Sequence, residues 1–262
     1  MESDSWDFYF IELDGDPASI SVDFKYESID ERRTHDTAAI FEIQMHDVGE
    51  HGWGSRVEAE ALWPLEKEIA AAASNRFVWV ARMRTAGLWT LFYYGGPDVL
   101  EVLRPIAHGL DRGERSAQFL HKSDPRWQFY EEELLPNPER RGWISDRKVV
   151  HSLEQQGDDL DAERPVDHFA YFRTAAGRDA FVAEAAKAGF RLERISDDAV
   201  SDDGDREFRF AAQVVRDDSV ELERIHEVVW TLVLLANEHD GVYDGWGAPI
   251  VKPKSGWLRR RG

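Results

Sequence analysis

The alternation of hydrophobic and polar residues predicts an antiparallel sheet in the first half of the chain. Alternation over residues 6–25, interrupted by a turn of Asp and Gly residues, predicts a hairpin. A third strand is expected near residues 40–45, and a second hairpin over residues 77–94. Apolar residues recur at helical spacing before and after this second hairpin. The first half is therefore expected to be a sheet with helices packed on one face.

The first half also contains signals for the start of a helix and for an edge strand. Ser55 is suited to cap a helix whose apolar positions run from Leu62 to Ile69. Pro64 falls inside that pattern, so it either kinks the helix or delays its start. Phe119 and residues 127–130 are expected to add an edge strand to the sheet.

A polar, proline-rich stretch is expected to join two domains. Residues 136–144 begin with Pro-Asn-Pro, which breaks regular structure, and continue with charged residues and a glycine. The expected domains are residues 1–135 and residues 145–262. Ser145 is expected to cap the first helix of the second domain.

The second domain has a clearer pattern, which predicts the β-α-β-β-α-β order of a ferredoxin-like fold. Ser219 is expected to cap its last helix, and a very acidic turn is expected between its two middle strands. The fold class is therefore α+β, with two antiparallel-sheet domains that each carry helices on one face. The expected elements are strand 166–172, helix 175–188, strand 190–196, strand 207–215, helix 219–238 and strand 242–251.

Both halves resemble known bacterial families. The opening Trp6-Asp7-Phe8-Tyr9 and the element order over residues ~5–135 are similar to domain-of-unknown-function family 695, which implies no known activity. The run from Asp167 to Phe172, the helix end at Gly189-Phe190 and the sequence Tyr-Asp-Gly-Trp-Gly at 243–247 resemble the regulator of ribonuclease E activity B (RraB) family. This second resemblance implies a protein that inhibits an RNA-degrading enzyme by binding it and carries no chemistry of its own.

Composition and charge narrow the classes of partner. The chain is 42% hydrophobic and 12% aromatic, which is enough to build folded cores, and it has no cysteine, which suits the cytoplasm. The net charge of −19 divides into −13 for residues 1–135 and −6 for residues 136–262, although the tail from Lys252 is basic. An acidic body repels phosphates, so direct binding of nucleic acid is not expected, whereas a basic protein partner would be attracted.

The acidic turn and the Tyr-Asp-Gly-Trp-Gly sequence supply the candidate partner-binding residues. The acids would attract a basic segment, and an exposed aromatic side chain would anchor it. In the alternative, the aromatic residues belong to the core. Gly245 and Gly247 would then permit unusual backbone angles or the close approach of another chain. The candidate contacts are Asp197, Asp198, Asp202, Asp203, Asp205, Tyr243, Asp244 and Trp246.

The sequence gives little support for catalysis. His168 and Asp167 are adjacent in a strand and therefore point to opposite faces, which excludes a dyad. His226 and His239 are too far apart on one helix to share a metal ion. Phosphate-binding loops, a Gly-x-Ser-x-Gly elbow and paired metal ligands are all missing, so no catalytic residue, metal or cofactor is assigned.

The sequence therefore predicts a non-enzymatic binding protein of the bacterial cytoplasm, whose partner by resemblance is an RNase E-type ribonuclease. No signal peptide is expected, and the longest apolar run, Val228–Ala236, is about half of the ~20 residues that a membrane span needs. One alternative is a metal-assisted hydrolase. Another is a repurposed binding protein whose partner is a different protein or a small molecule. Patterning leaves the oligomeric state open.

Overall fold

The computed structural model describes residues 5–28, 32, 34–73, 76–96, 98–111, 115–199 and 207–253. The chain divides into two compact units, Met1–Arg140 and Arg141–Gly262. Each unit holds one antiparallel sheet with helices, which confirms the α+β fold class.

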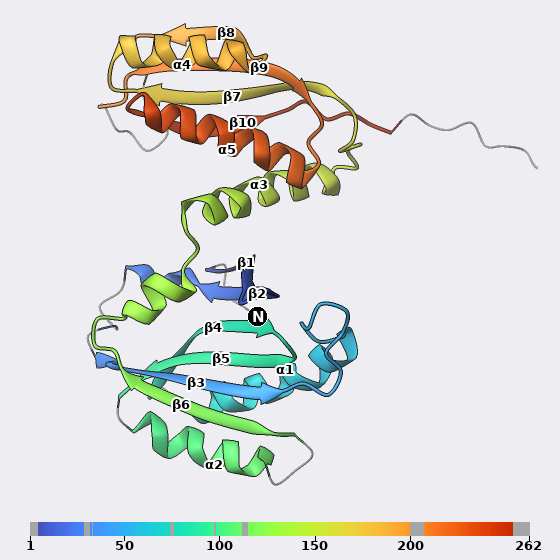
Figure 1. The fold of residues 1–262 in the computed structure, drawn as a ribbon, viewed down its shortest axis with the longest axis vertical. Coiled ribbons are helices and arrows are strands. Elements are labelled where there is room, and N and C mark those ends of the chain that lie inside the picture. The colour runs from blue at the N-terminus through green and yellow to red at the C-terminus, as the bar shows by residue number, and fades with distance from the viewer. Residues whose placement is uncertain are drawn as a thin grey trace, which may run out of the picture. The chain divides into compact units, whose positions relative to one another are not determined.

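The N-terminal unit contains a six-stranded sheet in the order β1-β2-β4-β5-β3-β6 (Figure 1). Both expected hairpins form, and the second turns through Ala86 and Gly87, which have φ angles of 47° and 78°. Such a pair of positive φ angles matches the twist of hairpin strands. The strands are β1 (Trp6–Leu13), β2 (Asp16–Asp23), β3 (Thr37–Gln44), β4 (Phe77–Thr85), β5 (Leu88–Gly95) and β6 (Ala117–Ser123).

Two helices, α1 (Arg56–Ala73) and α2 (Val99–Asp111), pack on one face of this sheet. Ser55 does cap α1, since its Oγ accepts a hydrogen bond of 3.2 Å from the amide of Glu58. Pro64 lies inside the helix and does not delay its start. The core between helices and sheet is built from alternate strand residues such as Phe41, Trp89 and Leu91 and from helix residues such as Leu62 and Leu103.

The opposite face of the sheet is covered by the segment that follows β6, and here one expectation was wrong. Residues 127–130 add no strand; they enter a short helical turn that continues as η3 (Tyr130–Leu134), a π-helical turn. The reason is local: the carboxylate of Asp124 accepts hydrogen bonds from the amides of Gln128 and Phe129, at 3.0 and 2.9 Å, and so starts a helix. The edge strand itself is β6, which includes Phe119.

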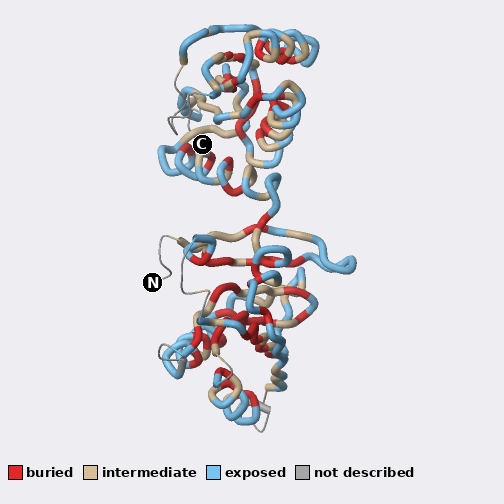
Figure 2. Tube along the Cα trace, turned by 90° about the vertical axis from the view of Figure 1, so that its left-hand side faces the viewer, coloured by how far each residue is buried: buried red, intermediate tan, exposed pale blue. Residues whose placement is uncertain are grey.

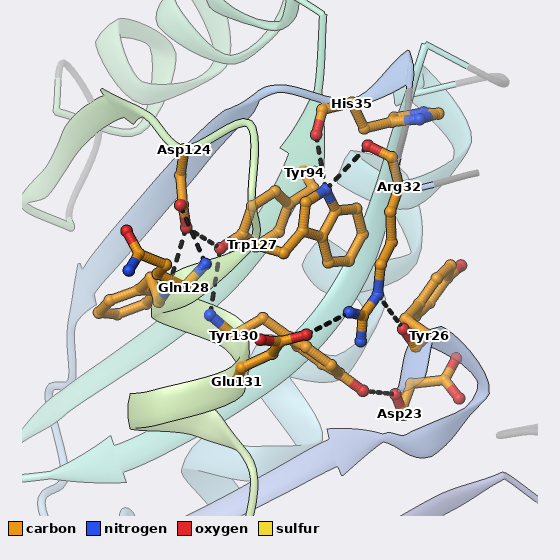
Figure 3. A network of polar contacts seen from close by, with 11 residues as sticks. Asp23, Tyr26, Arg32, His35, Tyr94, Asp124, Trp127, Gln128, Tyr130 and Glu131 are labelled. Carbon is orange, nitrogen blue, oxygen red and sulfur yellow. Dashed lines mark hydrogen bonds and ion pairs between the residues drawn. The ribbon is translucent and has the colours of Figure 1, made fainter. Parts of the chain in front are cut away.

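Figure 3 shows how this segment is fixed to the sheet. The Trp127 ring stacks on Tyr94 with 3.9 Å between the ring centroids, and its Nε1 donates to the carbonyl oxygen of His35 at 2.7 Å. The Tyr94 hydroxyl donates to Asp124 at 2.6 Å, and the Tyr130 hydroxyl donates to a backbone carbonyl of the first hairpin at 2.7 Å. These aromatic residues are the second core of the unit rather than an edge.

The C-terminal unit has a four-stranded sheet in the order β10-β7-β9-β8, which is the arrangement of a ferredoxin-like fold (Figure 1). Helices α4 (Ala175–Lys187) and α5 (Leu222–Glu238) pack on the same face of this sheet, where Phe181 and Leu232 contact residues of its two central strands. The strands are β7 (Arg164–Phe172), β8 (Arg191–Ser196), β9 (Phe210–Asp218) and β10 (Gly241–Gly247).

Helix α3 (Pro138–Gln155) begins seven residues before the expected cap at Ser145. Asn137 caps it, since its side-chain oxygen accepts from the amide of Arg140 at 2.9 Å. Pro138 occupies the first helical position, where a missing N–H costs nothing. The same Asn-Pro pair that suggested a linker therefore starts a helix, and most of residues 136–144 are helical.

Further boundaries differ from expectation in this unit, and the strand expected at residues 207–215 is β9 at Phe210–Asp218. Ser219 does not cap α5, because β9 continues to Asp218 and buried Val220 donates its amide to the carbonyl of Leu160 before the helix begins. The last strand ends at Gly247 rather than at residue 251. Val251 bonds the loop after α3 instead, where its amide donates to the Asp158 carboxylate at 2.8 Å.

The burial of residues alternates along the central strand β7. Val166, His168, Ala170 and Phe172 are buried against the helices, whereas Phe169 and Tyr171 point to the other face. Figure 2 shows buried stretches in the interior of each unit and exposed stretches at its surface. The face of the C-terminal sheet opposite the helices is referred to below as the open face.

Candidate protein-binding surface

Aromatic side chains lie on the open face of the C-terminal sheet. Phe169 is 37% exposed although it lies on a central strand, and Tyr171 is half-buried beside it. In the strand register Phe169 pairs with Gln213 of β9, and Tyr171 pairs with Val242 of β10. Paired residues of antiparallel strands share a face, so these side chains form one continuous surface. Val242 is 36% exposed and extends the apolar area.

A pocket of about 330 Å³ opens on this surface between β7, β9 and the end of β8. Its volume lies at the lower end of the range for ligand pockets, which suits one or two side chains of a partner. The walls combine aromatic rings, small alanines and a few polar groups. The lining residues are Phe169, Ala170, Tyr171, Arg194, Ile195, Ser196, Ala199, Ala211, Ala212 and Gln213.

The two aromatic residues of the Tyr-Asp-Gly-Trp-Gly sequence point away from the open face, toward the helices. The Tyr243 hydroxyl shares a hydrogen bond of 2.7 Å with Nδ1 of His168. The Trp246 Nε1 donates to the carboxylate of Asp146 on α3 at 2.8 Å. The other oxygen of Asp146 lies 2.8 Å from Nδ1 of His226 on α5. These contacts tie α3, α5 and β10 together within the unit.

Burial shifts the proton affinities of this network. Burial raises the pKa of Asp146, although hydrogen bonds from His226 and Trp246 work against the rise. Burial lowers the pKa of His168 to about 3, and the positive charge of Arg216 adds to the effect. His168 is therefore neutral at physiological pH and acts as a packed polar core residue.

The remaining residues of that sequence border the open face. Gly245 has a φ angle of +142°, which favours glycine, and a side chain there would meet nothing within 4 Å. Gly245 pairs with Phe169, and Gly247 pairs with Asp167, so these glycines leave the neighbouring β7 side chains uncovered. Asp244 is exposed at the register shift between Tyr243 and Gly245.

Two of the candidate acids lie next to the pocket. Asp197 and Asp198 are exposed and come between Ser196 and Ala199, which both line it. Asp197 is already paired with Arg178 of α4, a buried guanidinium. Asp202, Asp203 and Asp205 lie outside the described residues.

In the part of the chain that the structure describes, no group of three or more His, Asp or Glu side chains is placed to hold a metal ion. None of the described helices is long and apolar enough to span a membrane.

The residues of the open face were missed by reasoning from sequence. The signal was present in Asp167-His168-Phe169-Ala170-Tyr171-Phe172, where large side chains occupy both alternating sets of positions. A strand covered on one side should carry polar residues on the other, so the aromatic pair Phe169 and Tyr171 marked a second apolar face.

Fold and surface together define a two-domain α+β protein with a ferredoxin-like unit whose sheet presents an aromatic face. A family model described as regulator of ribonuclease activity B (RraB) matches residues 143–248, and one described as a family of unknown function (DUF695) matches residues 4–135. The chain belongs to the RraB family through its C-terminal unit and to the DUF695 family through its N-terminal unit.

Two curated relatives are similar to the C-terminal unit, and both are named regulator of ribonuclease activity B. The protein of Alteromonas mediterranea is 28% identical over 110 residues, which are 42% of this chain and 81% of the relative. The protein of Photobacterium profundum is 31% identical over 103 residues, which are 38% of this chain and 75% of the relative.

Proposed function

We propose that this protein is a non-catalytic regulator that binds an RNase E-type ribonuclease and lowers its activity. The observation that carries the proposal is the membership of the C-terminal unit in the RraB family, whose named members are regulators of ribonuclease activity. The cytoplasm, where messenger RNA is degraded, is the proposed compartment.

The open face of the C-terminal sheet is the proposed contact surface. Phe169 and Tyr171 offer exposed ring area, and the adjoining pocket accepts an apolar side chain. Aromatic residues of this kind carry a large share of binding energy at protein interfaces. Tyr243 and Trp246 support this surface from the other side of the sheet through their hydrogen bonds to His168 and Asp146.

The acidic residues around the open face would select a basic segment of the ribonuclease. The face is bordered by Asp167, Asp198 and Asp244, which would attract a lysine or arginine of the partner. The positive charge of that side chain would also be attracted to the faces of the aromatic rings. Asp197 would add to the same negative potential, although its carboxylate is paired with Arg178. The proposed attraction weakens with salt, because exposed charges are screened beyond about 8 Å at physiological ionic strength.

Two measurements test the proposal in sequence. First, the full chain is added to a purified RNase E-type enzyme of the host, and cleavage of a defined RNA is followed. Inhibition is expected. Second, host proteins are captured on the immobilised chain at low and high salt, from lysate treated with nuclease. Salt-sensitive, nuclease-resistant recovery of the ribonuclease is expected, and its absence from a host that makes the enzyme refutes the proposed target.

The surface is tested separately with matched variants. Phe169→Ala is expected to weaken binding about tenfold or more, as for a central aromatic contact. Asp198→Asn is expected to reduce the salt dependence of binding. Leu234→Ala is the control, since Leu234 is an exposed apolar residue (52%) on α5. Wild-type affinity in the Phe169 variant, with inhibition intact, would place the interface elsewhere on the unit and leave the proposed function standing.

A further inference from the structure

The strand register of the C-terminal unit places four different residues in one row across the open face. Gly245 of β10 pairs with Phe169 of β7, which pairs with Gln213 of β9. Gln213 in turn pairs with Arg194 of the edge strand β8. Because paired residues of antiparallel strands share a face, the row runs from an open glycine position through an aromatic ring and an amide to a guanidinium group.

One end of this row is a surface on which a flat ring can stack. The Phe169 ring is exposed, and in the described part of the chain it contacts no other aromatic ring and no cation. A Cβ atom at the neighbouring Gly245 would meet nothing within 4 Å, so the space beside the ring is open. Aromatic side chains that are exposed in this way bind nucleic acid bases by stacking, whatever the base.

The other end of the row carries a positive charge without a partner. Arg194 is exposed, lines the pocket of the open face, and forms no hydrogen bond or ion pair with any residue that the structure describes. Other arginines of the unit are engaged: Arg191 pairs with Asp217, and Arg178 pairs with Asp197. A guanidinium group binds phosphate oxygens through two parallel hydrogen bonds, so Arg194 is suited to hold an anion from outside the chain.

The pocket of about 330 Å³ connects these two ends, and its volume lies within the range of small-molecule sites. Neighbouring strands are about 4.8 Å apart, so the backbones of Phe169 and Arg194, two strands apart, are separated by roughly 10 Å. The Ser196 hydroxyl lies in the pocket wall, and Gln213 donates its amide hydrogen to Asp167 at 2.8 Å, which leaves its carbonyl oxygen to accept. The remaining small side chains of the wall are those of Ala170, Ala199, Ala211 and Ala212.

We propose that the open face binds a mononucleotide, with its base stacked on Phe169 and its phosphate held by Arg194. The sugar lies between these two groups, and Ser196 and Gln213 offer a hydroxyl and a carbonyl oxygen to it. A single guanidinium group matches a single phosphate. The carboxylates of Asp167 and Asp198 border the site and repel the further phosphates of a longer strand, which favours a small ligand over RNA.

The site overlaps the surface proposed above for the ribonuclease, since both use Phe169. A bound nucleotide would therefore compete with the ribonuclease and relieve its inhibition. This competition rests on the proposed function, whereas binding of the nucleotide does not. The two are tested separately for that reason.

Binding is measured by NMR on the full chain, with ¹³C-labelled alanine methyl groups. Ala211 lines the pocket, and its signal is assigned by its loss in Ala211→Gly. Adenosine 5′-monophosphate, adenosine and ribose 5-phosphate are titrated in turn, with the ionic strength held constant. The expected result is a saturable shift of the Ala211 signal with the nucleotide, and weaker binding of both fragments. No saturable shift with the nucleotide, or equal binding of either fragment, overturns the proposal.

Matched variants assign the two halves of the ligand. Arg194→Gln is expected to weaken binding of the nucleotide about tenfold or more and to leave binding of adenosine unchanged, because only the phosphate contact is lost. Phe169→Leu keeps an apolar side chain without a ring and is expected to weaken binding of both about fivefold or more. Arg224→Gln is the control, since it removes the same charge at an exposed position on α5. Equal effects of Arg194→Gln and Arg224→Gln overturn the assigned phosphate contact.

Two further measurements fix the kind of ligand and its consequence. A tetranucleotide that carries a 5′-phosphate is expected to bind no more tightly than the mononucleotide, and tighter binding would overturn the choice of a small ligand. Adenosine 5′-monophosphate is then added to the ribonuclease assay with and without this protein, and relief of inhibition is expected only with it. Nucleotide binding without such relief refutes the competition alone. Intact inhibition without any nucleotide binding refutes the nucleotide site and leaves the proposed function standing.

Discussion

Replacement of His168 by glutamine is expected to change how the stability of the C-terminal unit depends on pH. His168 is 1% exposed, and burial lowers its pKa to about 3, against about 6.5 in an unfolded chain. Between these values the unfolded chain binds a proton that the folded chain does not. Stability from the neutral histidine is therefore complete above pH 6.5 and is lost as the pH falls toward 3.

The magnitude follows from the two pKa values. Each pH unit inside the window is worth about 1.4 kcal/mol, so at pH 5 the histidine makes the folded state about 2 kcal/mol less stable than at pH 7.5. His168→Gln lacks this term but still has a group that can hydrogen-bond the Tyr243 hydroxyl. The free energy of unfolding of the variant should therefore approach or exceed that of the wild type as the pH is lowered.

Urea unfolding at pH 7.5 and pH 5.0, followed by NMR signals of β7 amides, measures the C-terminal unit alone. The difference in unfolding free energy between wild type and variant should move by about 2 kcal/mol between the two values of pH. His151→Gln, at a side chain that is 64% exposed, should follow the wild type. An imidazole signal of His168 that titrates near pH 6.5 in the folded protein would refute the reasoning.

Three further substitutions test the packing, each by urea or thermal unfolding. Asp146→Ala removes a buried acceptor of two side-chain hydrogen bonds and should cost about 2–4 kcal/mol, whereas Glu154→Ala on the exposed side of the same helix should cost under about 0.5 kcal/mol; equal losses would contradict the network. Gly241→Ala brings a methyl group within 2.3 Å of an aromatic ring and should cost about 2 kcal/mol or more, whereas Gly247→Ala meets open space; near-neutral behaviour of both would show that the ring can move away. Asp124→Ala removes the start of the helical turn in Figure 3 and should cost about 2–4 kcal/mol, and a loss below 1 kcal/mol would count against that anchoring role.

The pattern of hydrophobic and polar residues predicted strands and helices correctly where the burial of one face determines the secondary structure. The two hairpins, the Ser55 cap and the ferredoxin-like order all follow from periodicity and turn residues, and the structure confirms them. Pro64 could not be assigned from sequence, because only the surrounding packing shows that a helix tolerates it.

The errors came from residues whose partners are distant in sequence. Trp127 resembles a strand residue, but it stacks on Tyr94, 33 positions away, after Asp124 has started a helical turn. For Trp246 the sequence left both an anchoring role and a core role open, and the hydrogen bond from its indole Nε1 goes to Asp146, one hundred positions earlier. Periodicity contains no information about such pairings, so neither could be read from local sequence.

The edge strand β8 has a consequence for how other chains can approach the C-terminal unit. It carries the charged residues Arg191, Glu193 and Arg194, and its register with β9 shifts between Leu192 and Arg194. Charged side chains and bulges at an edge oppose the addition of a further strand. The β8 edge of the sheet is thus protected against pairing with a copy of itself. Self-association through backbone hydrogen bonds of β8 is discouraged, while side chains on the open face can still contact a partner.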